Sequence, residues 1–208
     1  MKAVALLSGG LDSVVSMLLG KQELDICLAI TIDYGQKARI NEIRAAKNIC
    51  VQHGIEHRLI ELSFMKDLKS GLLEGSGMEL SSPWVPNRNG LFINLAAAYA
   101  ENLDAGRVIC GFNREEAVDF PDNSSAYIKS LNSSLYFSTL NHVEVVSYVQ
   151  GMDKLEIIKR AQEMGLDFRS LWSCYVDGIR PCGQCPSCLR NKEAFEKAGI
   201  NYVEDFIY

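Results

Sequence analysis

The first group of residues with chemical potential is a glycine-rich hexapeptide, Ser8–Ser13 (SGGLDS), which follows an apolar run. Two glycines let the backbone approach a phosphate, and the N–H groups that open a helix attract negative charge. The serine hydroxyls can donate to phosphate oxygens, while Asp12 can cap the helix or hold Mg²⁺. A plain strand-to-helix turn also uses glycine, but the complete hexapeptide favours a phosphate-binding loop. It is not a Walker loop, because no Gly-Lys-Ser/Thr follows.

The second group is a cluster of four cysteines within fifteen residues: Cys174, Cys182, Cys185 and Cys188. Four thiolates are the number that tetrahedral zinc requires, and such a site leaves no position open for water. We therefore predict one structural zinc ion per chain. An iron–sulfur cluster also uses four thiolates, and a dithiol redox pair is a further reading of the two Cys-x2-Cys steps. The other three cysteines stand singly in apolar segments and are expected to be buried small side chains.

Composition narrows the class of protein. The chain has 208 residues, of which 48% are hydrophobic and 23% charged, as in an ordinary globular domain with a small appendage. A net charge of −5 gives no basic footprint, so we expect a small-molecule substrate and no direct nucleic-acid contact. The apolar run before Ser8 is too short for a membrane span or a signal peptide, so we expect a cytoplasmic protein.

The elements that position these groups alternate between apolar strand candidates and amphipathic helix candidates. This pattern predicts an α/β fold with an open, mostly parallel sheet and helices on both faces. A segment of 62–90 is rich in Gly, Ser and Pro, and loops of that length usually cover or build a site. A second polar loop is expected over 112–124. The expected strands are 2–7, 26–32, 56–61, 107–111 and 143–148, and the expected helices are 13–20, 40–52, 91–102, 125–135, 153–164 and 189–198.

The hexapeptide at the end of the first strand resembles the SGGxDS signature of the PP-loop ATP pyrophosphatase superfamily. That resemblance implies a Rossmann-like fold, ATP with Mg²⁺ as cosubstrate, and activation of a carboxyl oxygen as its adenylate. Asp33 ends the second strand, where it can meet ribose or metal, although Asp33-Tyr34-Gly35 can also be a plain turn. Lys154 opens a late helix, where it can reach phosphate or simply be solvated. The residues expected to bind ATP are Leu7, Ser8, Gly9, Gly10, Leu11, Asp12, Ser13, Asp33 and Lys154.

The whole chain resembles the 7-cyano-7-deazaguanine synthase family, which works in the pathway to queuosine and archaeosine. The matching motifs are 8–13, 33–36 (DYGQ), 85–89 (VPNRN), 120–122 (FPD) and 172–174 (WSC) with the later cysteines. The resemblance implies an ATP-dependent carbon–nitrogen ligase that adenylates 7-carboxy-7-deazaguanine and uses ammonia to form first an amide and then the nitrile. It also implies a homodimer and substrate contacts by Arg88, Asn89, Phe120 and Asp122. No catalytic side chain is assigned. We expect an ATP-binding domain over 1–168 and a zinc-binding region over 169–208 packed on it.

Three departures from the family pattern bear on the substrate end. Asn87 stands where the family usually has glycine, and Asn191 where it usually has arginine, with Arg190 beside it. The loop Glu116–Ser124 replaces a more aromatic and arginine-containing stretch. Space left by Ala117, Asp119 and Ser124 would admit an acceptor larger than ammonia, or be filled by the 62–84 loop.

Three other functions follow from these departures and from the class. The activated deazaguanine could be joined to another amine, such as a peptide or protein. The chain could instead be a different PP-loop ligase or a tRNA-thiolation enzyme. A non-enzymatic zinc module would leave Ser8–Ser13 unexplained.

Overall fold

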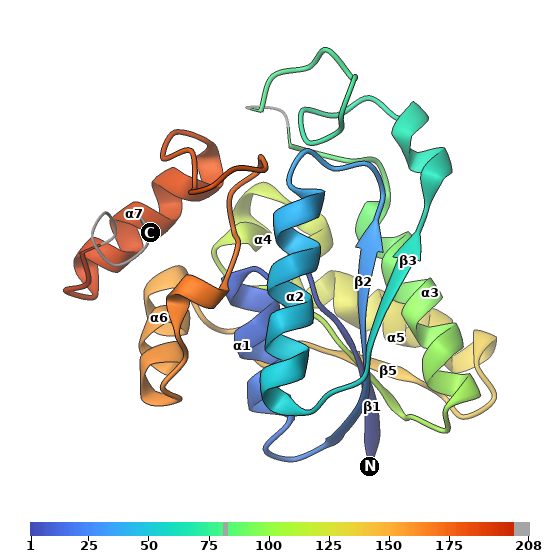
Figure 1. Ribbon diagram of the computed structural model, residues 1–208. Helices are drawn as coiled ribbons and strands as arrows, with labels where there is room; N and C mark the ends of the chain where they lie inside the picture. The colour runs from blue at the N-terminus through green and yellow to red at the C-terminus, as the bar shows by residue number, and fades with distance from the viewer. Residues whose placement is uncertain (81–82, 202–208) are drawn as a thin grey trace.

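A five-stranded sheet forms the centre of the computed structural model, which describes residues 1–80 and 83–201 (Figure 1). The strand order is β3-β2-β1-β4-β5, and every neighbouring pair is parallel. The predicted open parallel sheet is therefore confirmed. The strands are β1 (Lys2–Leu6), β2 (Asp25–Asp33), β3 (His57–Glu61), β4 (Arg107–Ile109) and β5 (Glu144–Val146).

Helices cover both faces of the sheet, as predicted (Figure 1). In β1, Ala3 and Ala5 belong to the core shared with α1 and α2, whereas Val4 belongs to the core shared with α3 and α5. Such burial on both sides is typical of a central parallel strand. The four covering helices are α1 (Leu11–Gly20), α2 (Arg39–His53), α3 (Arg88–Asn102) and α5 (Ser125–Ser138).

The chain changes direction across the sheet at β1. It passes outward through β2 to β3 and then returns on the other side of β1 to form β4. Open α/β sheets bind ligands at the carboxyl ends of strands beside such a switch point. Gly111 follows β4 there, and a Cβ on it would lie only 2.6 Å from the backbone nitrogen of Ser13. This close approach joins the end of β4 to the first turn of α1.

The C-terminal part of the chain packs on the outer side of α1. Val15 of α1 shares a core with Ile157 of α6 (Lys154–Glu163) and Phe195 of α7 (Pro186–Lys197). The division into 1–168 and 169–208 stays a prediction, and 202–208 lie outside the residues that the structure describes. No helix in the described part is both long and apolar enough to span a bilayer.

Several element boundaries differ from the predicted ones. α1 begins two residues early, at Leu11, because Gly10 is its N-cap. α7 begins at Pro186 and not at 189, because Cys185 caps it by accepting a bond from the Cys188 backbone N–H. The predicted loops also contain short helices that a pattern of 3.6 residues cannot reveal. These are η1 (Ser63–Asp67), α4 (Glu116–Asp119) and η2 (Pro121–Asn123), with η3 (Phe168–Ser170) before the cysteines.

Candidate active site

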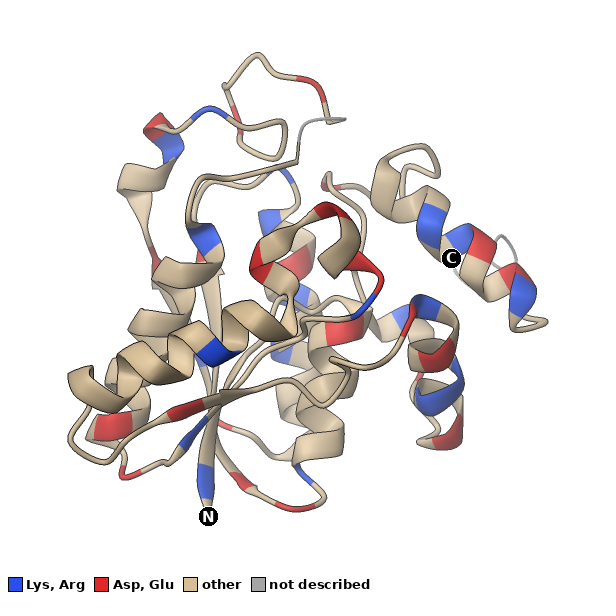
Figure 2. Ribbon diagram, turned by 180° about the vertical axis from the view of Figure 1, so that it is seen from behind, with Lys and Arg blue, Asp and Glu red and all other residues tan. Residues whose placement is uncertain are grey.

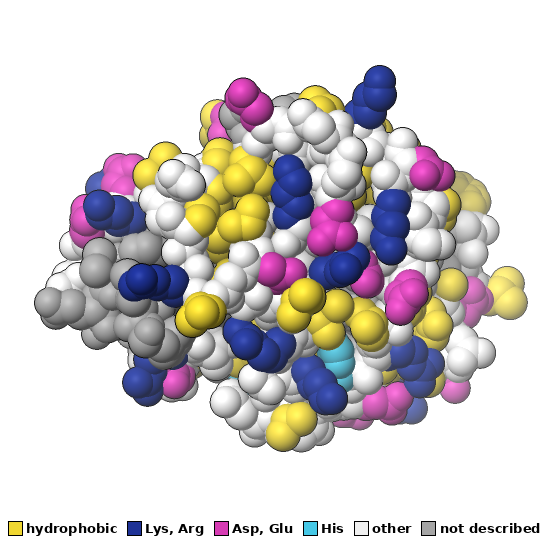
Figure 3. Space-filling view, turned by 45° about the horizontal axis from the view of Figure 1, so that its top comes forward, with side chains coloured by type: hydrophobic (Ala, Val, Ile, Leu, Met, Phe, Trp, Pro, Cys, Tyr) yellow, Lys and Arg dark blue, Asp and Glu magenta, His cyan; other side chains and the backbone are white. Residues whose placement is uncertain are grey.

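A cavity of about 270 Å³ opens at the carboxyl ends of β1, β2 and β4. The phosphate loop forms one end, and residues from the 83–93 and 120–123 segments form the other. On the surface at this end of the molecule, basic and acidic side chains are interspersed with apolar ones (Figure 3). The predicted site residues that line the cavity are Leu7, Ser8, Gly10, Asp12, Ser13, Arg88, Asn89, Phe120 and Asp122.

The phosphate loop is compact, and its hydroxyls converge. Ser8 Oγ lies 3.0 Å from Ser13 Oγ and accepts a bond from the Gly10 N–H at 3.3 Å. Gly9 has φ +79° and faces α2, where a Cβ would lie 2.7 Å from the carbonyl oxygen of Glu42. Leu11 packs in the core, with its N–H bonded to Ser173 Oγ at 3.3 Å. Gly9 and Leu11 therefore shape the loop and are not among the residues that line the cavity.

Lys154 lies behind the loop and is almost fully buried. Its Nζ contacts Asp12 Oδ2 at 2.5 Å and lies 3.7 Å from Glu116 Oε1. Arg190 Nη2 lies 3.8 Å from the same Glu116 oxygen. Burial alone would lower the pKa of Lys154, but attraction by Asp12 and Glu116 raises it above its ordinary value, so the side chain is an ammonium ion. Lys154 thus positions Asp12 and is not itself among the cavity-lining residues.

One carboxylate oxygen of Asp12 is left free by this pairing. Asp12 Oδ1 is buried and has no hydrogen-bond partner among the described residues. Buried carboxylate oxygens require a donor or a cation, and Mg²⁺ prefers oxygen ligands. An oxygen in this state beside a phosphate loop fits Mg²⁺ accompanying ATP.

Asp33 is the last residue of β2, its side chain closes the turn that follows, and it is not among the residues that line the cavity. Its Oδ1 accepts a bond from the Gly35 N–H at 2.9 Å, which is the plain-turn geometry that the sequence left open. Its neighbours Tyr34 and Gln36 line the cavity instead, and Tyr34 Oη accepts a 3.3 Å bond from Arg88. A contact between Asp33 and ATP remains a prediction.

The far end of the cavity combines flat aromatic surfaces with charged groups. The rings of Trp84 and Phe120 are nearly parallel, with an interplanar angle of 10° and centroids 6.3 Å apart. Asp122 lies next to them, and burial raises the pKa of its carboxyl group while the nearby Arg88 opposes the rise. Several Asp and Glu residues lie close together along the segment that contains α4 (Figure 2).

The departures from the family pattern leave this cavity largely intact. Asn87 has φ +52°, a left-handed conformation that glycine adopts freely and that asparagine tolerates better than other side chains. Ala117 and Asp119 do not line the cavity, and Ser124 caps α5 by accepting from the Tyr127 N–H. Ala117, Asp119 and Ser124 therefore lie beside the site, whereas Glu116, Phe120 and Asn123 of the same altered loop line the cavity. Trp84 of the long loop packs next to Phe120.

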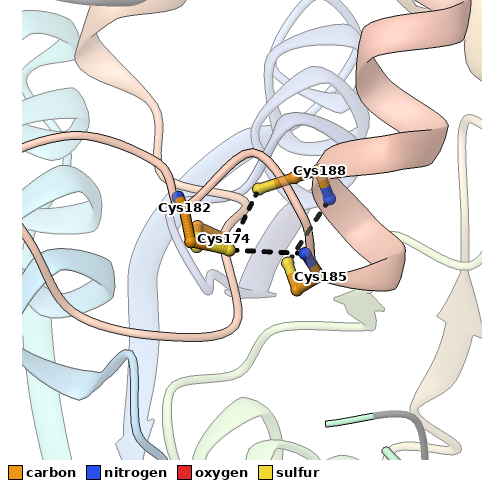
Figure 4. Close-up of side chains that lie close together, drawn as sticks. All are labelled: Cys174, Cys182, Cys185 and Cys188. Carbon is orange, nitrogen blue, oxygen red and sulfur yellow. Dashed lines mark hydrogen bonds between the residues drawn. The ribbon is translucent and has the colours of Figure 1, made fainter.

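The four cysteines of the cluster converge, as their spacing predicted (Figure 4). Their sulfur atoms all lie within 4.8 Å of one another, which suits tetrahedral ligation with metal–sulfur distances of about 2.3 Å. Backbone N–H groups of Cys182, Cys185 and Cys188 point at sulfurs of the cluster at 3.3–3.5 Å. These bonds would stabilise the negative charge of metal-bound thiolates. The geometry fits a closed metal site.

Sequence reasoning missed several residues that line the cavity. Trp84 stands alone in a long loop, and Glu42 looks like a polar position on an amphipathic helix. Trp172 and Tyr175 lie beside the first cysteine, and the Trp172 Nε1–H is buried without a partner among the described residues. Trp172 belongs to the matching motif at 172–174, but no role in the site was assigned to it. Trp84 and Tyr175 each stand next to a matching motif, whereas Glu42 carries no sequence signal of its own.

A parallel sheet that carries the SGGLDS loop of Ser8–Ser13 between β1 and α1, at the switch point, is the arrangement of the PP-loop class of ATP-using enzymes. Within that class, the chain belongs to the family described as "Queuosine biosynthesis protein QueC", whose model matches residues 2–199. It is 45% identical to the 7-cyano-7-deazaguanine synthase of Desulforudis audaxviator, over 96% of this chain and 98% of that protein. It is 46% identical to the synthase of Carboxydothermus hydrogenoformans, over 93% and 97% of the two chains.

A solved structure supports the fold independently. A 4-thiouridine synthetase, solved as an RNA complex with bound ATP, superposes with a TM-score of 0.60 at 18% identity. The superposition covers 95% of this chain and 50% of that one, and such distant similarity concerns the fold alone.

Proposed function

We propose that this chain is an ATP-dependent ligase that adenylates the carboxylate of 7-carboxy-7-deazaguanine and, with ammonia, converts it to 7-cyano-7-deazaguanine. The observation that carries the proposal is the pairing of full-length family membership with one cavity that has a phosphate loop at one end and an aromatic, charged end opposite. An adenylation enzyme must hold two anions next to each other, and its catalysis rests mainly on positioning and electrostatics.

ATP binds at the loop end in this proposal. The N–H groups and hydroxyls of Ser8–Ser13 hold the phosphates at the start of α1. Asp12, oriented by Lys154, contributes its free oxygen to Mg²⁺, which would neutralise phosphate charge during transfer. Leu7 and the backbone next to Asp33 would contact the nucleoside part of ATP.

The deazaguanine binds at the aromatic end. Its planar ring lies against Phe120 and Trp84, whose parallel faces suit stacking. Asp122 accepts hydrogen bonds from the ring edge, and Asn89 lines the same region. The Arg88 guanidinium lies in the cavity and attracts the substrate carboxylate toward the phosphate loop. A carboxylate oxygen then attacks the α-phosphate of ATP, and pyrophosphate leaves.

The remaining steps use ammonia and a second ATP. Ammonia displaces AMP from the adenylate to form the amide, and a second adenylation on the amide oxygen lets AMP leave again as the nitrile forms. The alternatives, transfer to a peptide or protein amine and tRNA thiolation, are not favoured, because relatives similar over nearly the whole chain are 7-cyano-7-deazaguanine synthases.

We further propose that the cysteine site holds zinc and that the enzyme is a cytoplasmic homodimer. Four thiolates without a water position favour structural zinc, and reducing conditions keep the thiols available. Phe137 and Leu140 near the end of α5 are 87% and 94% exposed, and they offer an apolar surface for a second copy. Metal analysis and light scattering on the purified protein test these two points.

The function is tested by mass spectrometry of the products. Incubation with 7-carboxy-7-deazaguanine, ATP, Mg²⁺ and ammonium should give the nitrile together with AMP and pyrophosphate. Omission of ammonium should stop the reaction at the adenylate. Formation of ADP, or no consumption of the deazaguanine under any condition, would refute the proposal.

A further inference from the structure

The proposed reaction requires a proton acceptor that the phosphate loop does not provide. When ammonia attacks the adenylate, a carbon–nitrogen bond forms, the carbon–oxygen bond to AMP breaks, and one N–H proton must leave. Conversion of the adenylated amide to the nitrile removes two further protons from the same nitrogen. Ammonium, the main form at neutral pH, must also lose a proton before it can attack. A general base near the substrate carbon is therefore needed.

Within the described parts of the chain, four carboxylates line the cavity: Asp12, Glu42, Glu116 and Asp122. The first is paired with Lys154, and the third lies close to both Lys154 and Arg190. The fourth lies beside the aromatic rings, where it suits the substrate edge. Glu42 and Asp122 each accept from a neutral amide, Gln36 Nε2 at 2.8 Å and Asn123 Nδ2 at 3.2 Å. Glu42 differs from Asp122 by its position, because it lies beside the phosphate loop.

Glu42 is also placed between the two ends of the cavity. It lies in the first turn of α2, and its carbonyl oxygen abuts Gly9 of the phosphate loop. Gln36 is fixed in turn, because its Nε2 donates to the Ile32 carbonyl at 3.1 Å and its Oε1 accepts from the Tyr34 N–H at 3.0 Å. The same Tyr34 accepts from Arg88. The DYGQ motif at 33–36 therefore orients an acid and a guanidinium that face one cavity.

We propose that Glu42 is the general base that removes protons from the attacking ammonia and from the amide nitrogen. This inference rests on the proposed function. The proton moves from nitrogen to Glu42 Oε1 or Oε2 as AMP departs, and it passes to solvent before the next half-reaction. Gln36 is a positioning residue, since it holds the carboxylate without touching the substrate.

The electrostatic surroundings suit this role. Burial raises the pKa of Glu42 to about 7, while the bond from Gln36 and the charge of Arg88 lower it, and Asp177 and Asp33 raise it further. A base with a pKa near the working pH can both accept and release a proton. Because only the ionised form accepts a proton, the ammonia-dependent rate should fall as the pH drops through about 7.

The test is the variant Glu42→Gln, which keeps an oxygen that can accept the Gln36 bond. Two activities are measured: pyrophosphate–ATP exchange dependent on 7-carboxy-7-deazaguanine without amine, which reports adenylation, and amide plus nitrile formation with ammonium. We expect exchange to stay within a few-fold of normal and product formation to fall by about 100-fold or more. The inflection near pH 7 should disappear, and hydroxylamine, largely unprotonated at neutral pH, should be affected less than ammonium.

The control is Glu56→Gln, which alters an exposed carboxylate paired with Arg58 outside the cavity. It should leave both activities unchanged. Near-normal ammonia turnover by Glu42→Gln would overturn the inference, and so would an equal loss of exchange and product, since Glu42 would then act in ATP or metal binding. Absence of exchange in the unaltered enzyme would instead refute the proposed function.

Discussion

Lys154 and Asp12 lie 142 positions apart in the sequence, yet Lys154 Nζ and Asp12 Oδ2 are 2.5 Å apart and both side chains are largely buried. The lysine side chain is 6% exposed and the aspartate side chain 19%. Removal of one partner from a buried ion pair leaves an uncompensated charge. We predict that Lys154→Met lowers the free energy of unfolding by about 3 kcal/mol.

A double variant separates stability from activity at this pair. Lys154→Met with Asp12→Leu should recover much of the stability, because an apolar pair can replace a buried ion pair at little cost. It should remain unable to consume ATP, since the proposed magnesium ligand is gone. Urea unfolding and AMP release measure the two properties. Normal ATP use by the double variant would contradict the role given to Asp12.

The metal site yields a second prediction. The purified protein should contain about one zinc ion per chain, and Cys185→Ser should lose the metal together with much thermal stability, because structural zinc contributes folding energy directly. Cys110→Ser is the matched control, because Cys110 is also a buried cysteine but does not belong to the cluster. Elemental analysis and thermal unfolding provide the readout. Iron with a visible absorption band would contradict the zinc assignment.

A pair of glycines tests the packing of the phosphate loop. Gly9 and Gly54 both have positive φ, at +79° and +65°, so alanine at either site costs about 1–2 kcal/mol through backbone strain. At Gly54 the new Cβ meets nothing within 4 Å, whereas at Gly9 it meets the α2 backbone at 2.7 Å. Gly9→Ala should therefore destabilise more and should also impair ATP binding. Equal losses of stability in urea unfolding would show that the contact with α2 gives way easily.

The aromatic end of the cavity gives a fourth prediction. Loss of a stacking side chain typically costs about 1–3 kcal/mol per base, so Trp84→Ala should raise the KM for 7-carboxy-7-deazaguanine by roughly 5- to 150-fold. The KM for ATP should change little. Phe64→Ala is the control, because Phe64 is an exposed aromatic side chain outside the cavity. Steady-state kinetics with each substrate varied in turn measure the two KM values. An equal rise in both KM values would contradict the placement of the Trp84 ring.

The phosphate loop and the cysteine cluster could be predicted from sequence because both are local. Ser8–Ser13 and the four cysteines bring their functional atoms together within one turn or one short stretch. Sheet class was predictable for the same reason, since each strand and helix carries its own periodicity. The strand order was not, because pairing across the sheet joins segments far apart in the chain.

The rest of the site depends on tertiary contacts that leave little trace in sequence. Glu42 occupies a polar position on α2, and only the bond from Gln36 and the closeness of the phosphate loop distinguish it. Trp84 belongs to a loop without periodicity. Asn87 looked like a loss at a glycine position until its φ of +52° showed that the backbone is kept. α4 has four residues, too few for a helical pattern.

The hydrogen bonds between the cysteine-bearing region and the phosphate loop have a consequence for protein synthesis. Trp172 N–H donates to the Gly9 carbonyl at 2.9 Å, and Ser173 Oγ accepts from the Leu11 N–H. The ribosome makes Gly9 early and Trp172 much later, so the nascent chain carries an unfinished nucleotide site during most of translation. A chain that stalls before residue 172 would thus lack both contacts, and its phosphate loop would be without these two supports from the cysteine-bearing region.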